Sequence, residues 1–431
     1  MAILYLKSEN PNLSYIIKKN PATGLTARHL KRGSMFGYFS EGDAQTYNVY
    51  FKDAPNEISY PEYKDQEFEY INVTRYNSSH FILDALSEMF RDPTRKQVEL
   101  DVGGFQHELV CNMVGLRSRR TLAAFIQHFQ QECTIVAVEV APKSYSVTFT
   151  TKKSLHYLLN LVNLFASFNL VRASEEGFFV GEEAIEKYLQ CLTIIDPPYF
   201  IRYEFKLNLI YGANAFKKYR PLLEKSSKYA ISMCHGDSTV MRMDAILPCL
   251  NYSGSIIDVG CGEGRYAFKI APKLSRGSKY HAIDINPDCL DIVSHKSKLK
   301  QIDNILTYPS LEAFEMSDAL GDSTTTYDVL MSEVIEHMDL SEATALVLRC
   351  LALPKLTSLV ITTPNKDFNG NFFDDGENLR HPDHKFEFTA EEFLTWLQEF
   401  GGGLEYFPVG DTVDGISMTL GAVFRKREVT T

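Results

Sequence analysis

From Gly254 onward, the sequence alternates short apolar runs with segments of helical spacing. Alternation of this kind is typical of a parallel β-sheet with helices on both faces. Because the carboxyl ends of parallel strands meet at one edge of the sheet, we expect ligands to bind along that edge. The expected strands are Ser255–Val259, Tyr280–Asp284, Ile305–Tyr308, Val329–Ser332, Leu359–Thr362 and Ile416–Phe424, and a late helix is expected over Glu391–Phe400.

The preceding part of the chain is less regular, and its first 80 residues are rich in Asn, Pro, Tyr and Gly. It predicts an α+β domain, so we expect one domain over residues 1–240 and a second over 241–431. The polar segment Phe216–Lys228 is expected to be a linker, and Met241–Leu250 a helix that leads into the second domain. The other expected elements are hairpins about Gly103-Gly104 and Pro142-Lys143, a helix capped by Ser78 or Ser79, and helices over Thr121–Gln131, Lys153–Leu170 and Gly181–Leu192.

The composition of the chain indicates which cellular compartment and which binding partners to expect. The chain has 431 residues, enough for two or three domains, and no apolar run of about 18 residues that would predict a membrane span. The N-terminus lacks the pattern of a signal peptide, and the eight cysteines are scattered without a CxxC pair, so we expect reduced thiols and a cytoplasmic protein. A net charge of −11 is unusual for a protein that grips long nucleic acid, although it is compatible with holding one nucleotide end.

A glycine-rich turn, IIDVGCGEGR, follows the first expected strand. Gly260 and Gly262 allow a tight turn and the close approach of a ligand. Asp258 stands two residues before the first glycine, where a carboxylate would repel a pyrophosphate but can hold a cation. That suits the ammonium and sulfonium groups of S-adenosylmethionine, and Asp284 at the end of the next strand can accept hydrogen bonds from both ribose hydroxyls. The alternative interpretation is a structural turn with buried glycines.

The stretch YDVLMSEVIEHM places Glu333, Glu336 and His337 at positions i, i+3 and i+4, which share one face of a helix. Two carboxylates and an imidazole at a strand end suit a divalent metal. The segment RHPDHKFEFT adds His381 and His384. One alternative is a solvated acidic start of a helix. A second is a zinc peptidase, but the reversed zinc-binding motif H-x-x-E-H requires a histidine where this chain has Glu333.

The glycine-rich part resembles the class I S-adenosylmethionine-dependent methyltransferases. Together, SEVIEHM, TTPNKDFN and RHPDHKFEFT narrow the resemblance to the HUA-enhancer-type methyltransferases, which act on the 2′-hydroxyl at the 3′ end of RNA. The resemblance implies a Rossmann-like, mostly parallel seven-stranded sheet and metal ligands at Glu333, Glu336, His337 and His384, with Thr363–Asn365 facing the site. It gives His381 no such role, and Phe388 stands where the family usually has tryptophan.

A divalent cation suits this chemistry because a ribose hydroxyl is a poor nucleophile whose pKa such an ion lowers. Only a free 3′ end offers two vicinal hydroxyls to one ion. Magnesium prefers oxygen ligands, whereas imidazole favours ions such as manganese, so we expect manganese or magnesium, with manganese slightly ahead. One of the two metal-site histidines is a further candidate to accept the departing proton.

The first half resembles, in order, the N-terminal module of the bacterial branch of that family, through LSYIIKKNPATG, GYFSE, LLNLVNLF and VGEEAIEKYL. The resemblance implies RNA repair beside a kinase–phosphatase–ligase, which this module engages and activates. The alternatives are an inert accessory domain, a scaffold that activates a ligase without catalysis, and a small-molecule diol or catechol O-methyltransferase. Three basic groups could neutralise RNA phosphates, although such groups more often form a solvated face. They are Arg117, Arg119 and Arg120, then Lys217, Lys218 and Arg220, then Lys296, Lys298 and Lys300.

Overall fold

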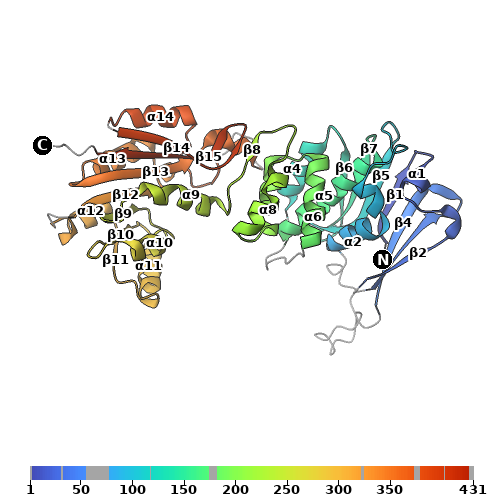
Figure 1. Cartoon of the computed structure of the whole chain (residues 1–431), viewed down its shortest axis with the longest axis horizontal. Coiled ribbons are helices and arrows are strands. Elements are labelled where there is room, and N and C mark those ends of the chain that lie inside the picture. Colours follow the sequence, from blue (N-terminus) through green and yellow to red (C-terminus); the bar gives the residue numbers. More distant parts are fainter. Residues whose placement is uncertain are drawn as a thin grey trace. The chain divides into compact units, whose positions relative to one another are not determined.

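The computed structural model describes residues 2–30, 33–54, 77–116, 118–173, 182–321, 325–372, 379–401 and 403–426. The chain forms two compact units, residues 1–228 and 229–431 (Figure 1). Helix α9 (Ser238–Ile246) spans the domain boundary expected at residue 240. Where the chain can be cut into two independently folding domains therefore stays a prediction. No helix among the described residues is long and apolar enough to cross a membrane.

Unit 1 is built on a seven-stranded sheet in the order β2-β3-β4-β1-β5-β7-β6, and every neighbouring pair is antiparallel. Leu6, Val49, Leu109, Val147 and Phe149 point to one buried face, which alternates with a more exposed face as the pleat requires. The strands are β1 (Ala2–Ser8), β2 (Thr26–Leu30), β3 (Gly33–Ser40), β4 (Asp43–Asp53), β5 (His107–Gly115), β6 (Thr134–Ala141) and β7 (Ser144–Thr151).

Helix α5 (Leu155–Ala173) is the centre of the helical layer of unit 1. It packs against α2, α3, α6 and α7 as well as β5 and β7. Its apolar side chains are buried around most of the helix, as expected of a helix enclosed by its own domain. The other helices are α1 (Leu13–Ile16), α2 (His80–Met89), α3 (Arg91–Arg95), α4 (Arg119–Phe129), α6 (Glu182–Ile195), α7 (Tyr199–Leu209) and α8 (Ala213–Glu224).

Two predictions for unit 1 are wrong. Residues 97–106 form no strand, so there is no hairpin about Gly103-Gly104; instead the Asp101 carboxylate accepts hydrogen bonds from the backbone N–H groups of Leu155 and His156. The segment expected to be a linker lies mostly in helix α8, which buries Phe216 on its inner face. The hairpin about Pro142-Lys143 is confirmed as β6 and β7.

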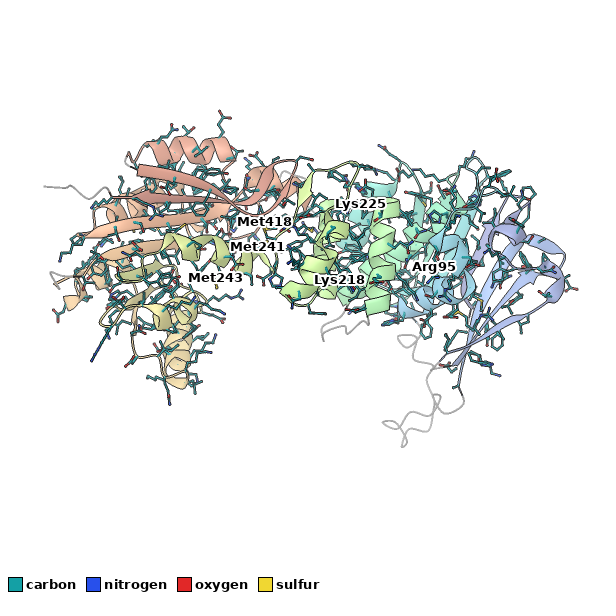
Figure 2. All side chains as sticks on the ribbon, viewed as in Figure 1. Arg95, Lys218, Lys225, Met241, Met243 and Met418 are labelled. Carbon is teal, nitrogen blue, oxygen red and sulfur yellow. The ribbon has the colours of Figure 1, made fainter. Side chains whose placement is uncertain are left out.

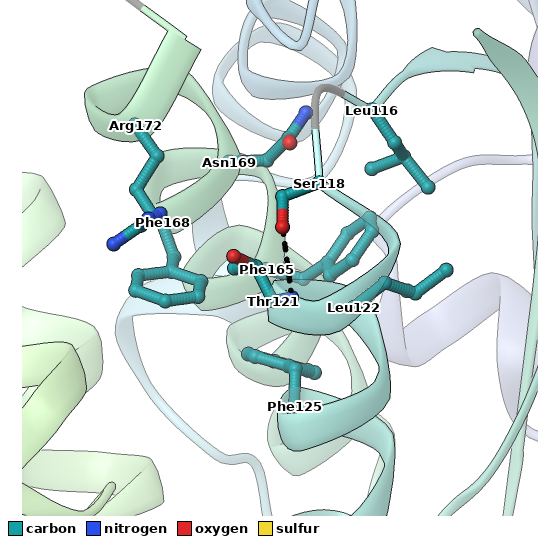
Figure 3. A pocket seen from close by; sticks show the side chains of 9 residues that line it. All are labelled: Leu116, Ser118, Thr121, Leu122, Phe125, Phe165, Phe168, Asn169 and Arg172. Atoms are coloured by element: carbon teal, nitrogen blue, oxygen red, sulfur yellow. Dashed lines mark hydrogen bonds between the residues drawn. The ribbon is translucent and has the colours of Figure 1, made fainter. Parts of the chain in front are cut away.

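The basic stretch LRSRRT lies at the start of α4, next to a pocket of about 90 Å³ between α4 and α5 (Figure 3). Phe125, Phe165 and Phe168 line it together with Arg172. Arg119 is exposed, and its guanidinium donates to Glu139 and to the Tyr145 hydroxyl. Of the other two candidate RNA contacts here, Arg120 is exposed and Arg117 lies outside the described residues.

Unit 2 contains the expected doubly wound sheet, in the order β11-β10-β9-β12-β13-β15-β14-β8. The first five strands in this order are parallel, and the last three pair antiparallel. Two strands were not among the six segments expected: β14 and the two-residue β8. The sheet therefore has eight strands, one more than the seven that the resemblance implies. The strands are β8 (Ile231–Ser232), β9 (Ser255–Val259), β10 (Tyr280–Ile283), β11 (Ile305–Tyr308), β12 (Tyr327–Ser332), β13 (Leu356–Pro364), β14 (Gly403–Val413) and β15 (Ile416–Arg425).

Helices cover both faces of this sheet, as predicted. Consecutive residues of one strand belong to opposite cores: Ile257 packs with α12, α13 and α14, whereas Ile256 packs with α9 and α10. The last described strand, β15, lies inside the sheet between β13 and β14, with eight of its ten residues buried. The helices are α9, α10 (Ala267–Ile270), α11 (Pro287–Leu299), α12 (Leu311–Glu315), α13 (Leu340–Leu351) and α14 (Ala390–Gln398).

Side chains fill the space between these layers. Figure 2 labels Met241 and Met243 on α9 and Met418 on β15. Met241 and Met418 lie close to Gly410, which has φ +85°.

All eight cysteines lie in the described part of the chain, and each is a free thiol, as predicted.

Candidate active site

The glycine-rich loop after β9 turns at three glycines with positive φ, at Gly260, Gly262 and Gly264. Only at the first and third does packing also forbid a side chain, since a Cβ atom would lie 2.5 Å from Val334 at Gly260 and 2.9 Å from Val293 at Gly264. At Gly262 a Cβ atom would meet no neighbour, so this glycine borders open space. The loop is therefore held by packing at its two ends and open in the middle.

Asp258 lies beneath this loop and is 1% exposed. Its Oδ2 accepts a hydrogen bond of 2.6 Å from the Tyr280 hydroxyl. Burial raises the pKa of Asp258 to about 7; the Tyr280 hydrogen bond opposes the rise and the Asp284 charge adds to it. The residue is thus a carboxyl that changes charge near neutral pH rather than a permanently ionised surface group.

Asp284 follows β10 directly and is half-buried at the carboxyl edge of the sheet. Its Oδ2 accepts from the backbone N–H of Gly262 at 2.8 Å, and its Oδ1 accepts from that of Asn286 at 2.9 Å. The first of these bonds links the carboxylate to the glycine-rich loop. Each oxygen retains a lone pair, so the group can accept further bonds from hydroxyls of a ligand.

The turn after β12 differs from the helix that the sequence predicts. Glu333 has φ +58°, a left-handed conformation that is unfavourable for a side chain with a Cβ atom. Only Ile335–His337 then form a single 3₁₀ turn, so Glu333 does not share a helix face with Glu336 and His337. The Glu333 carboxylate instead pairs with Arg242 of α9, with Nη1 and Oε2 3.4 Å apart, and its Oε1 is buried without a hydrogen-bond partner in the described part of the chain.

Glu336 is fully buried. Its Oε2 accepts from the Thr363 hydroxyl at 3.1 Å, whereas its Oε1 has no hydrogen-bond partner among the described residues. Burial and the nearby Glu333 charge hold the pKa of Glu336 well above its usual range. Its backbone carbonyl accepts from the N–H of Lys385 at 2.7 Å, which ties this turn to the segment that carries His384.

His337 and His384 meet Glu336 at this point. One ligand atom from each of these three residues lies within 4.8 Å of the others. The two imidazole rings are 4.9 Å apart, centre to centre, and His337 is the exposed member of the group. Partial burial of its ring and the neighbouring His384 lower the pKa of His337, which favours the neutral form that can bind a metal.

The two remaining predicted residues lie at the edge of this cluster. Glu333 is close enough for its charge to raise the pKa of Glu336, but it is not among the three residues whose ligand atoms converge. His381 has an exposed side chain and a ring 5.7 Å from that of His384.

A buried network that the sequence analysis missed holds His384 in place. Its Nδ1 lies 2.5 Å from Oε1 of Glu387, whose other oxygen accepts from the Asn369 amide. Arg380 completes the network through its backbone N–H to Glu387 and its guanidinium to Asn369. The three-residue spacing of His384 and Glu387 could have indicated their contact from the sequence. No sequence pattern indicates that Asn369 and Arg380 join them.

Of the neighbouring predicted positions, Thr363 faces the site as expected, since its hydroxyl donates to Glu336. Thr363 and Pro364 are the last residues of β13 rather than residues after it, and the Asn365 amide donates to the Ser417 carbonyl instead of pointing toward the histidines. Phe388 is buried and stacks on Trp396, with ring centres 5.2 Å apart, so it takes an apolar role.

Comparison with known proteins places the chain in a family. A family model described as Hen1 N-terminal domain matches residues 3–228, which is more than half of the chain. The chain belongs to the Hen1 family. A second model, for a methyltransferase domain, matches residues 238–403 of this Hen1 chain, and a methyltransferase fold implies S-adenosylmethionine as the methyl donor.

Several curated relatives of this Hen1 chain are named small RNA 2′-O-methyltransferase. The Caenorhabditis elegans protein is 32% identical over 22% of this chain and 21% of its own length. The Arabidopsis thaliana protein is 28% identical over 35% of this chain and 17% of its own length, and the Schizosaccharomyces pombe protein is 26% identical over 33% and 42%. The chain therefore spans less than half the length of each of these relatives.

Two solved structures resemble the whole Hen1 chain. A chain in the structure of the Pnkp1/Rnl/Hen1 RNA repair complex covers 98% of it, with a TM-score of 0.81 and 23% identity, and the match includes all of that chain. A second structure of the Pnkp1/Rnl/Hen1 complex gives a TM-score of 0.79 at 23% identity, over 99% of this chain. Because these matches cover nearly the whole chain, they support the fold of unit 1 as well as that of unit 2.

Proposed function

We propose that this chain transfers a methyl group from S-adenosylmethionine to the 2′-hydroxyl of the 3′-terminal nucleotide of RNA, with the help of a divalent metal. The observation that carries the proposal is the convergence of ligand atoms from Glu336, His337 and His384 at the carboxyl edge of the unit 2 sheet. The glycine-rich loop ends at the same edge, because β9 and β12 are parallel neighbours. A methyl donor and a metal-held hydroxyl would then lie side by side.

On the donor side, Asp284 would accept bonds from the ribose hydroxyls of the bound donor, because its oxygens have lone pairs free beside the loop. Asp258 would act from beneath the loop by its charge. A cationic ammonium and sulfonium above it would favour its ionised form. Gly260 and Gly262 would let the backbone approach the ligand.

On the acceptor side, Glu333, Glu336, His337 and His384 would hold the ion. The residues fit it: the buried Oε1 atoms of Glu333 and Glu336 have no partner in the described residues, and an ion would satisfy both. A divalent cation supplies Lewis acidity that lowers the pKa of a hydroxyl. A mixed set of oxygen and imidazole donors favours manganese over magnesium.

The protein's own groups prepare these ligands before any ion binds. Glu387 accepts from Nδ1–H of His384, which leaves Nε2 of that ring as the atom with a free lone pair. Arg242 would hold the Glu333 carboxylate beside the site through their ion pair. During methyl transfer the 2′-oxygen bonds to the methyl carbon as the bond from that carbon to the donor sulfur breaks, which releases S-adenosylhomocysteine. The 2′-hydroxyl loses its proton in this step, and a site histidine or water would receive that proton.

We further propose that unit 1 engages and activates an RNA ligase, so that methylation and end joining occur in one repair assembly with a kinase–phosphatase–ligase. The match of the Hen1 N-terminal domain model to residues 3–228 supports this, as does the likeness of the whole chain to one in an RNA repair complex. The chain would then act in the cytoplasm, where its free thiols remain reduced.

The test is to incubate the full chain with methyl-labelled S-adenosylmethionine, manganese and a short RNA with a 2′,3′-diol end. Label should enter the terminal 2′-oxygen, and an RNA with a terminal 2′-deoxynucleotide should accept none. Transfer to catechol but not to RNA would favour the small-molecule alternative. Ligase activation without any methyl transfer would favour the scaffold.

A further inference from the structure

A second polar cavity lies in unit 1, far in sequence from the residues of the candidate active site. It has a volume of about 160 Å³ and is formed by helices α2, α3, α5 and α6. Its positively charged lining residues are Arg91 and Arg95 of α3 and Lys187 of α6. Figure 2 labels Arg95 on this helical side of the unit. Three cations gather here although the whole chain carries a net charge of −11.

Three carboxylates close to these cations in the sequence, on α3 and α6, pair with other lysines. Asp92, between the two arginines, pairs with Lys18 at 2.9 Å. On α6, Glu182 and Glu186 both pair with Lys218, at 3.4 and 3.5 Å.

In the described part of the chain, Arg91, Arg95 and Lys187 therefore make no ion pair of their own. By contrast, Arg119, Arg172, Arg202 and Arg220 of the same unit each pair with a carboxylate.

The rest of the lining suits an anion that carries an organic group. Asn163 and Gln190 carry uncharged amides able to donate hydrogen bonds, and Lys187 reaches the Ser87 hydroxyl at 3.4 Å. Leu83, Leu86 and Tyr188 supply an apolar floor.

One carboxylate, Asp84, opposes the three cations, which leaves the lining with a net charge of +2. Burial, with the Asp84 charge adding to it, raises the pKa of Tyr188 to about 12, so the phenol stays neutral and adds no negative charge.

We propose that this cavity binds a phosphate group of an RNA strand. The guanidinium fork matches the oxygens of a phosphate, and the apolar floor can cover the attached ribose. This inference rests on the proposed function, since it makes unit 1 hold part of the RNA whose 3′ end unit 2 methylates. A free nucleotide or inorganic pyrophosphate offers the same chemistry and serves as the second arm of the test.

The test compares the full chain with the triple variant Arg91→Ala/Arg95→Ala/Lys187→Ala. A matched control, Lys7→Ala/Lys52→Ala/Lys152→Ala, removes three exposed lysines from the same unit and changes the net charge equally. Fluorescence anisotropy with a labelled 12-nucleotide RNA gives affinity at several salt concentrations, and calorimetry gives the affinity for pyrophosphate. Circular dichroism verifies that both variants are folded.

We expect the pocket variant to bind RNA about 10- to 100-fold more weakly, because charge-assisted hydrogen bonds are lost. The slope of log affinity against log salt should become shallower by about 0.7 for each phosphate contact removed, while the control changes little. Equal losses in both variants, or none in the pocket variant, would overturn the proposal. Weaker pyrophosphate binding with unchanged RNA affinity would overturn the assignment to RNA.

Methyl transfer is measured separately, so that failure of the pocket and failure of the proposed function can be told apart. The pocket variant should keep its rate at saturating RNA and need a higher RNA concentration to reach it. If the wild-type chain binds RNA through this cavity but methylates none, the cavity stands and the proposed function fails.

Discussion

The imidazole of His384 and the carboxylate of Glu387 form a buried pair, with Nδ1 and Oε1 2.5 Å apart and the Glu387 side chain fully enclosed. This contact fixes the tautomer of the histidine and the plane of its ring. Carboxylate–histidine pairs of this kind tune metal sites in many proteins. The pair is thus the clearest sign that the cluster is organised before it binds anything.

The first prediction concerns this pair. Glu387→Gln should weaken manganese binding by about 10- to 100-fold, because the ring loses its negatively charged acceptor. Calorimetry of manganese binding measures the change directly, without relying on activity. Glu391→Gln, an exposed site on α14, is the control and should bind the metal as the wild type does. Equal affinity in both variants would show that Glu387 only packs.

The second prediction treats Glu333, Glu336, His337 and His384 as one unit. Each single alanine variant should lose nearly all methyl transfer, and the quadruple variant should be little worse, because ligands of one ion act together. Cofactor binding should survive in every variant.

His381→Ala is the control for these variants and should keep substantial activity. A dead His381→Ala beside an active His384→Ala would reverse the choice of histidine. Full activity in strong chelator would remove the metal altogether.

The third prediction concerns Asp284. Asp284→Ala should weaken S-adenosylmethionine binding by about tenfold or more, since a charged acceptor of ribose hydrogen bonds and the anchor of the Gly262 N–H are lost together. Asp288→Ala, exposed on the first turn of α11, is the matched control. Asp258→Ala should also weaken binding. Both aspartate variants should stay folded, and unchanged affinity in both would refute the cofactor assignment.

The fourth prediction follows from the pKa of about 7 at Asp258. In the unfolded chain this carboxyl has a pKa near 4, so between about pH 4 and 7 the folded protein holds the extra proton. Stability from this group is therefore greatest at low pH and declines as pH rises through that window.

A cationic donor prefers the ionised carboxyl, so its affinity should do the opposite and rise with pH up to about 7, by at most tenfold per unit. Calorimetry at pH 6 and 8 measures the difference. Asp258→Asn should abolish it, and a flat wild-type profile would contradict the electrostatic role.

The fifth prediction concerns separability. Protease should cut between α8 and α9, in residues 225–237, and the fragment 229–431 should fold and methylate RNA. A fragment from residue 241 should be less stable, because it loses β8 and the Asp237 cap of α9. Mass spectrometry locates the cuts, and thermal unfolding compares the fragments. A fragment 229–431 that cannot fold would mean that the two units depend on each other.

Sequence patterns predicted the parallel strands of unit 2 because each is a short, mostly apolar run between helical segments, as in Ser255–Val259, where all five residues are buried. They missed β14, whose exposed and half-buried residues include Pro408 and Gly410 and give no such run. They also missed helix α8, because its charged outer face and internal Pro221 look like a linker. Burial by the rest of the fold, rather than local composition, decided both cases.

The candidate site shows the same division. Residue types and spacing pointed to Glu336 and His337. They left His381 and His384 as alternatives, of which the family resemblance selected His384, and the structure brings His384 to Glu336 and His337. Spacing alone could not predict the positive φ of Glu333, which takes that residue off the expected helix face. Nor could it predict Arg242, because its contact with Glu333 joins residues 91 positions apart in the sequence.

The interior position of β15 affects how the protein is made. The ribosome synthesises this strand after the other strands of the unit 2 sheet, yet it must insert between β13 and β14. Until then the growing chain exposes the unpaired edge of β13, whose residues are almost all buried in the finished sheet. Unpaired apolar edges promote aggregation during folding. Nascent chains arrested before residue 416 should therefore bind chaperones, and release should follow once β15 has emerged.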